Sequence, residues 1–300
     1  MTIRRPEDGA AVRDLIASPG GGPTALRIML GAQLRRLREG KRITLEDAGY
    51  AIRGSGSKMS RLETGRVSFK SRDIADLLTL YGVTSAQERE SMLELARQAS
   101  AMGWWHDYAD VMPAWFEPYV GLEEAASSIR CFETQCVPDL LQTADYARAI
   151  ARLSHPGGSD DEIGRRVSLL MARQAAITRP APGHLWMVLD EAALRRPVGG
   201  SAVMRGQLGH LMDTADRPNV SLQVVPLTAS GNAVARGGFT VLRFSEPDLP
   251  DVVYLEQLTS ALYLDKRETV DLYMAVLERL CVEALTAEGS LKMIRDLLDE

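Results

Sequence analysis

A short segment near residue 60 concentrates side chains that bind phosphate groups and the edges of nucleic-acid bases. Four polar residues stand close together there, namely Ser57, Lys58, Ser60 and Arg61. Met59 and Leu62 lie three positions apart among them, as on the buried face of a helix. Arginine can donate two parallel hydrogen bonds to guanine, and lysine and serine bind phosphate oxygens. The segment therefore predicts an exposed helix face that contacts nucleic acid.

The surrounding residues predict two short helices joined by a tight turn. Thr44 is placed as the N-cap of the first helix, and Ser55 as the N-cap of the second. Gly49 supplies the small residue that lets the second helix cross closely. In the connection, Gly54 follows Arg53 as the residue that turns at no steric cost. This is the pattern of a helix-turn-helix, whose second helix enters the major groove of DNA.

Three further segments complete a predicted five-helix bundle. Leucines recur at intervals of three and four residues over 24–40, and Ser71 is expected to cap a fourth helix. Residues 84–101 are predicted as the fifth helix. We interpret residues 1–23 as a flexible tail and residues 24–83 as an all-α DNA-binding domain.

The charge distribution supports this division. Residues 24–82 hold twelve Lys or Arg and six Asp or Glu, a net charge of +6, whereas the whole chain carries −5. Because residues 1–23 are neutral, residues 83–300 carry −11. A basic segment joined to an acidic body is expected when one domain meets phosphate and the other does not.

Composition favours a cytoplasmic location. The three cysteines, an odd and sparse set, indicate reduced thiols instead of a disulfide framework. No apolar run approaches the roughly 18–20 residues that span a bilayer, and the N-terminal residues lack the apolar core of a secretory signal. We expect a cytoplasmic, nucleoid-associated protein without a membrane partner.

The remainder of the chain alternates between helical and strand-like segments. Helices are predicted over 122–134, 144–153, 163–177, 201–215, 267–285 and, capped by Ser290, 291–298. Strands are predicted over 185–189, 220–226, 239–244 and 252–255. The predicted fold is α+β, with the N-terminal helical bundle followed, over 122–300, by a regulatory or partner-binding domain with a small, mostly antiparallel sheet.

Aromatic residues are dense between these two domains. Residues 84–121 are interpreted as a helical joint containing Trp104, Trp105, Trp115 and Phe116. Aromatic side chains at this density usually form a hydrophobic joint, and a cage for a small-molecule effector is the alternative.

No pattern of residues predicts an enzyme. Asp190 and Glu191 are adjacent at a strand end, where neighbouring side chains point to opposite faces, so Asp190 is expected to cap a short helix. The four histidines are scattered without metal-ligand spacing. Cys131 and Cys136, placed on or beside one helix, suit neither a zinc site nor a redox pair, and buried thiols are expected. We therefore predict no catalysis, no metal and no cofactor.

The strings SKMSRLETGR (57–66) and ADLLTLYGV (75–83) resemble the lambda repressor/Cro-like (XRE) helix-turn-helix family. The resemblance places base-reading positions at Gly56, Ser57 and Arg61, and the exposed Ser60 is added to them. Phosphate contacts are assigned to Lys58, Arg53, Arg66, Lys70 and Thr44.

Two residues depart from the pattern of that family. Gly56 has no side chain to read bases with, and Leu45 stands where a phosphate-binding Gln is frequent. Arg61 is thus expected to read a guanine. The alternative is that Arg61 pairs with phosphate or with Glu63.

The C-terminal strings WFEPYVGLE (115–123), VPDLLQTADYARA (137–149) and DVVYLEQLTSALYLD (251–265) resemble the antitoxin-like regulators of actinobacteria. The resemblance implies a transcriptional regulator with a small partner protein encoded nearby. A single reading head contacts few base pairs, so we expect a homodimer on a pseudo-palindromic operator in double-stranded DNA. The alternatives are an interaction protein that sequesters the partner, and a sensor of a small-molecule effector.

Overall fold

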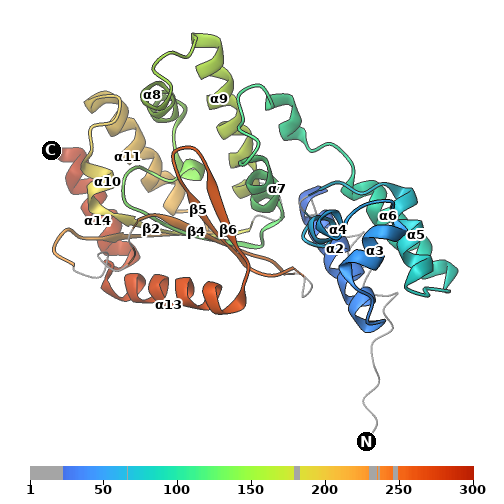
Figure 1. Ribbon diagram of the computed structural model, residues 1–300. Helices are drawn as coiled ribbons and strands as arrows, with labels where there is room; N and C mark the ends of the chain where they lie inside the picture. Colours follow the sequence, from blue (N-terminus) through green and yellow to red (C-terminus); the bar gives the residue numbers. More distant parts are fainter. Residues whose placement is uncertain (1–22, 66, 179–182, 230–234, 236, 246–248) are drawn as a thin grey trace, which may run out of the picture. The chain divides into compact units, whose positions relative to one another are not determined.

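The computed structural model describes residues 23–300 apart from 66, 179–182, 230–234, 236 and 246–248. The chain forms two compact units, which Figure 1 shows as ribbons. The first extends to His106 and includes Ser245–Leu249, and the second comprises Asp107–Phe244 and Pro250–Glu300. Of the predicted tail, residues 1–22 lie outside the described residues, and Pro23 begins a helix. No helix among the described residues is long and apolar enough to cross a membrane.

The first unit contains the five helices that the sequence predicts. They are α2 (Pro23–Gly40), α3 (Leu45–Ala51), α4 (Gly56–Glu63), α5 (Ser71–Leu80) and α6 (Ala86–Ala99). Their apolar faces share one core, in which Leu30, Leu34 and Met59 are fully buried. The predicted N-caps of α3 and α4 are confirmed. The Thr44 hydroxyl accepts the Asp47 N–H (3.1 Å), and the Ser55 hydroxyl accepts the Lys58 N–H (3.2 Å).

The crossing of α3 and α4 depends on the predicted small residue. A methyl group added at Gly49 would lie 2.6 Å from the carbonyl carbon and oxygen of Ser55. Such a distance is far below van der Waals contact, so any side chain at this position would push α3 away from the start of α4.

Two predicted details of this region are wrong. The left-handed residue of the turn is Arg53, with φ 55°, whereas the positive φ was expected at Gly54. The Gly54 N–H instead donates to the Gly49 carbonyl (2.8 Å), which closes the end of α3. Ser71 does not cap α5 either, because Lys70 occupies the N-cap position without a side-chain hydrogen bond and Ser71 is the first helical residue.

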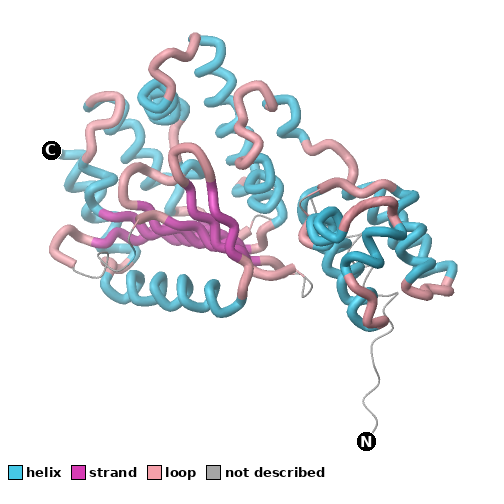
Figure 2. The backbone as a smooth tube through the Cα atoms, viewed as in Figure 1, coloured by secondary structure: helices cyan, strands magenta, loops and turns pink. Residues whose placement is uncertain are grey.

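The second unit is built on a mixed six-stranded sheet (Figure 2). Its strands are β1 (Ser128–Glu133), β2 (His184–Asp190), β3 (Val220–Val225), β4 (Phe239–Arg243), β5 (Val252–Glu256) and β6 (Ala261–Leu264). The spatial order is β3-β2-β1-β4-β5-β6. The first three strands pair in parallel, and β4, β5 and β6 extend the sheet antiparallel from β1. The α+β class is confirmed.

Helices cover both faces of the sheet. One face packs on α13 (Arg267–Glu283) through a core that includes Phe132, Val241 and Val253. On the other face lie the helices of the segment 144–215, as Figure 1 shows. The remaining helices of this unit are α7 (Glu117–Ala125), α8 (Ala144–Ser154), α9 (Asp160–Arg173), α10 (Glu191–Arg195), α11 (Ser201–Ala215) and α14 (Ala287–Asp299). Three short 3-10 segments span Trp104–Tyr108, Asp139–Leu141 and Gln174–Ile177.

The central strand of this sheet was predicted as helix. The segment 122–134 contains only the end of α7, and its second half is β1. Its apolar residues fit a helical period as well as a strand, and β1 is paired on both sides, by β2 and β4. Tertiary pairing therefore decided the outcome. The predicted cap Ser290 is also wrong, because Thr286 caps α14 and the buried Ser290 hydroxyl accepts the Val224 N–H (2.9 Å).

Candidate nucleic-acid interface and ligand pocket

Helix α4 presents the polar face that the sequence predicts. Met59 and Leu62 are buried in the core of the first unit, while Ser57, Ser60 and Arg61 are exposed. The Arg61 Nε lies 3.4 Å from the Ser57 carbonyl oxygen of its own helix. Among the described residues Arg61 forms no ion pair, so its guanidinium can reach an external acceptor.

The alternative partner for Arg61 is already occupied. Glu63 binds Arg38 through two hydrogen bonds, Nε to Oε1 (2.6 Å) and Nη2 to Oε2 (3.0 Å), and both side chains are buried. This pair joins α2 to the end of α4. Arg61 and Glu63 therefore do not form an ion pair in this structure.

The predicted phosphate contacts differ in their surroundings. Lys58 pairs with the buried carboxylate of Asp73 (2.8 Å), and Arg53 pairs with Asp76 (3.0 Å). Lys70 is exposed at the start of α5, and Arg66 lies outside the described residues. Thr44, besides capping α3, donates its hydroxyl hydrogen to Asp47 (2.7 Å). Two of these cations would thus exchange a carboxylate for a phosphate on binding DNA.

Two residues of α3, Glu46 and Tyr50, lie beside the predicted interface on α4 or add to its exposed surface. A methyl group at Gly56 would lie 2.9 Å from the Glu46 Oε1, so this position offers backbone atoms alone to a partner. Tyr50, which the sequence reasoning missed, is 86% exposed on α3. The sequence alone does not single out Tyr50, because its exposure depends on which face of α3 packs against the bundle.

The aromatic residues predicted as a joint are divided between the two units. Trp104 and Trp105 form an edge-to-face pair in the first unit, with centroids 5.9 Å apart, and Trp105 is buried. Trp115 and Phe116 belong to the second unit. Phe116 stacks on Tyr119 of α7 at 5.3 Å, and it lines a pocket that Trp104 and Trp105 do not.

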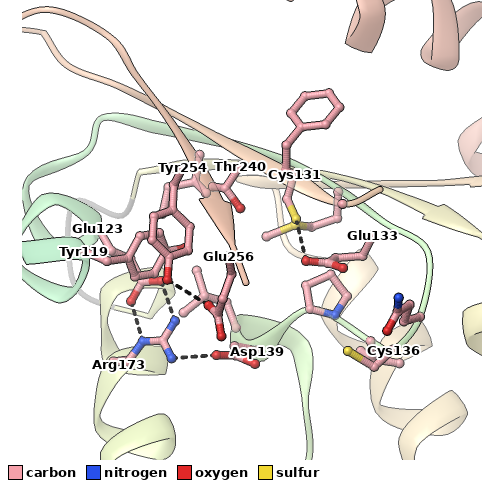
Figure 3. Close-up of a pocket in the computed structure, with 18 of the residues that line it drawn as sticks. Tyr119, Glu123, Cys131, Glu133, Cys136, Asp139, Arg173, Thr240, Tyr254 and Glu256 are labelled. Carbon is pink, nitrogen blue, oxygen red and sulfur yellow. Dashed lines mark hydrogen bonds and ion pairs between the residues drawn. The ribbon is translucent and has the colours of Figure 1, made fainter. Parts of the chain in front are cut away.

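A cavity of about 280 Å³ lies in the second unit, where β1 ends (Figure 3). Alternate residues of the sheet form its floor, among them Cys131, Thr240 and Tyr254, which occupy neighbouring register positions on β1, β4 and β5. Helices α7 and α9 supply Tyr119, Glu123 and Arg173 as one wall, and the segment 134–140 supplies another.

Arg173 organises the polar side of this cavity. Its Nε and Nη2 donate to the two oxygens of Glu123 (2.8 Å each), and its Nη1 donates to Asp139 (2.7 Å). The guanidinium also lies 4.9 Å from the centre of the Phe116 ring. Because all three nitrogens are engaged, Arg173 is a fixed part of the wall.

Glu133, the last residue of β1, lies in the same cavity without a cationic partner among the described residues. The Cys131 thiol is its neighbour, with Sγ 3.9 Å from Oε1. Burial, with a smaller contribution from the carboxylates of Asp139 and Glu256, raises the pKa of Glu133 to about 8. The group is therefore poised to be ionised by a bound cation.

The cysteines behave as predicted in one respect and not in another. Cys131 lies on β1 and Cys136 in the segment after it, so the expectation that they share a helix is wrong. Burial raises the pKa of both thiols, that of Cys136 to about 12. Both thiols are thus protonated at neutral pH. No group of three or more His, Cys, Asp or Glu in the described part of the chain is arranged to hold a metal ion.

A second cavity of about 450 Å³ adjoins the first. Phe116, Asp139, Arg173 and Glu256 line both cavities. The second is more apolar, and its wall includes Val111, Met112 and Trp115, from the segment that directly follows the first unit. Helix α9 binds this segment through Arg165, which pairs with Asp110 (2.5 Å), and Arg166, which donates to the Val111 carbonyl (2.6 Å).

Two family models match the chain, one in each of its two parts. Residues 116–296 match a family model described as "Domain of unknown function (DUF5753)", which covers more than half of the sequence. The chain belongs to this family. Residues 29–92 match a model described as "Helix-turn-helix domain". No curated protein and no solved structure gave a match. The DUF5753 chain thus carries a helix-turn-helix domain, the kind that binds DNA in transcription regulators.

Proposed function

We propose that this DUF5753 protein is a sequence-specific transcription regulator that reads DNA with α4. The observation that carries the proposal is the exposed face of Ser57, Ser60 and Arg61 on the second helix of a helix-turn-helix. In such domains the residues of this helix contact base edges in the major groove. Arg61 is the proposed reader of guanine, because Glu63, its alternative partner, is already bound by Arg38.

The finer proposal is that the regulator belongs with the XRE-type, antitoxin-like regulators of actinobacteria and binds as a dimer. A pseudo-palindromic operator then has two half-sites about 34–36 Å apart, one turn of the double helix or a multiple of it. The proposal assigns the protein no catalytic activity.

We further propose that the DUF5753 domain controls the reading head. The segment 107–116 links the two units along the chain, and it forms part of the wall of the larger cavity. Helix α9 holds this segment near its start through Arg165 and Arg166, and the same helix ends at Arg173 in the smaller cavity. Occupancy of the cavities would therefore act on the segment that leads to the head.

Selection of bound duplexes from a random library by the full chain tests the central part of this proposal. We expect enrichment of a pseudo-palindrome with two matching half-sites. Enrichment of a single half-site would refute the dimer and leave the reading role of α4 intact. A bound pool that stays random would contradict sequence-specific recognition.

A further inference from the structure

The smaller cavity lies where the strand order of the sheet changes direction. From β1 the chain adds β2 and β3 on one side, and β4, β5 and β6 extend the sheet on the other side. Glu133 is the last residue of β1, and residues 134–140 line the cavity directly after it. In open sheets with parallel strands, ligands bind in the crevice beyond the carboxyl end of a strand at such a point.

Carboxyl groups outnumber cationic groups in this cavity. Four carboxylates line it, those of Glu123, Glu133, Asp139 and Glu256. One buried cation faces them, Arg173, and its three nitrogens are used by Glu123 and Asp139. Among the described residues, neither Glu133 nor Glu256 forms an ion pair. Glu256 accepts a hydrogen bond from the Tyr254 hydroxyl (2.8 Å), and neither carboxyl group has a cationic partner in the described part of the chain, so a bound cation would stabilise the ionised form of both.

An unused acceptor lies in the adjoining wall. Gln142 is 1% exposed and lines the larger cavity, and its Nε2 donates to the Val137 carbonyl (2.7 Å) and to Asp139 (3.2 Å). Its Oε1 is buried without a hydrogen-bond partner in the described structure. A buried acceptor without a donor destabilises the folded protein, so a ligand that donates a hydrogen bond is favoured there.

The walls around these acceptors are aromatic and apolar. Phe116, Tyr119 and Tyr254 form an aromatic cluster beside the carboxyl groups, with Tyr119 and Tyr254 centroids 4.2 Å apart. The adjoining cavity adds Trp115, Ile150 and Leu170. Aromatic faces attract cations and also pack against apolar bodies.

We propose that the two adjoining cavities bind a small organic amine whose ammonium group lies among the carboxylates and whose apolar body fills the larger cavity. The ammonium donates to Glu133 and Glu256, and the Gln142 Oε1 accepts from a donor near the junction. The described residues offer no cluster suited to a metal ion, which favours an organic cation. That this amine controls DNA binding rests on the proposed function, whereas its binding does not.

Isothermal titration of the full chain in the absence of DNA tests the proposal. The probes are phenethylammonium chloride, its neutral analogue 2-phenylethanol and the anion 3-phenylpropionate. We expect the amine to bind at least about tenfold more tightly than the alcohol, since a tenfold change equals about 1.4 kcal/mol. Equal affinity of amine and alcohol, tighter binding of the anion, or no heat with the amine up to about 10 mM would each overturn the proposal.

Isosteric variants locate the site. Glu133→Gln and Glu256→Gln should each weaken binding of phenethylammonium about tenfold and leave 2-phenylethanol unaffected. The matched control is Glu278→Gln, an exposed carboxylate on α13, the helix that packs against the opposite face of the sheet. Amine binding that is unchanged in both cavity variants would place the cation elsewhere and overturn the assignment.

A separate titration with the selected duplex distinguishes the two proposals. If the amine binds and duplex affinity is unchanged, the ligand site stands and its regulatory role fails. If the duplex is not bound at all while the amine binds, the DNA-reading proposal fails on its own.

Discussion

At the scale of single residues, Arg61 carries the proposed sequence readout. We expect Arg61→Ala to weaken binding to the selected duplex by roughly 1–3 kcal/mol and to relax the preference at one base pair per half-site. Arg61→Lys is the matched control, because it retains the charge and loses the two-pronged geometry. Competition titrations with single-base variants of the duplex measure both effects. Equal weakening on every duplex by Arg61→Ala would make Arg61 a phosphate contact.

Glu133 gives the DUF5753 domain a pH dependence of known sign. Its pKa rises from an ordinary value of 4.5 to about 8 on folding, chiefly through burial. The folded state thus retains a proton that the unfolded chain releases, and stability falls as pH rises between these values. Glu133→Gln removes this effect, so its advantage over the natural protein should grow from pH 5 to pH 8.

Thermal unfolding at several pH values measures this difference. One pKa unit corresponds to about 1.4 kcal/mol, so the advantage is on the order of a few kcal/mol at pH 8. Glu278→Gln, on the exposed side of α13, should show no such trend. A stability difference between Glu133→Gln and the natural protein that is constant with pH would contradict the assigned shift.

At the scale of elements, the crossing of α3 and α4 is the most constrained contact of the reading head. Gly49→Ala should destabilise the head by roughly 1–3 kcal/mol, because the added methyl meets the Ser55 backbone at 2.6 Å. Gly206→Ala, in the exposed interior of α11 with nothing within 4 Å of the added methyl, should instead stabilise by about 0.5–1 kcal/mol. Urea unfolding followed by circular dichroism reports both. Similar effects of the two changes would argue against the close crossing.

The elements also show what local sequence can predict. The helices of the head were predictable because Thr44 and Ser55 cap them through local hydrogen bonds and their leucines repeat at a helical period. Strand β1 was not, since its apolar residues fit a helical period as well as a strand, and its long-range pairing with β2 and β4 decides the outcome. The turn residue Arg53 was missed because glycine is the usual choice where φ is positive.

The ligand pocket was harder to predict from the sequence than the reading head. Its charged residues come from α7, β1, the segment after β1, α9 and β5, so they are brought together by the fold alone. Ser57, Ser60 and Arg61 all lie within α4, and local periodicity sufficed to place them on its exposed face. Glu133 differs from an ordinary surface carboxylate in its burial and in the absence of an ion-pair partner among the described residues, and sequence spacing reveals neither.

At the scale of the whole molecule, the two parts of the chain carry net charges of opposite sign. The segment 24–82 carries +6 and residues 83–300 carry −11. The acidic part repels DNA, so attraction to phosphate is confined to the head. The cavity that contains Glu133 and Glu256 lies in this acidic part, which further favours a cationic ligand over an anionic one.

Sequence reading by α4 can be measured in solution as a difference in affinity between two duplexes. The full chain is titrated by fluorescence anisotropy against the selected duplex and against a scrambled duplex of equal length, both at about 150 mM salt. We expect the full chain to bind the selected duplex at least about 10³-fold more tightly than the scrambled one, at the lower end of specific recognition. Equal affinity for the two duplexes would contradict sequence reading by this helix.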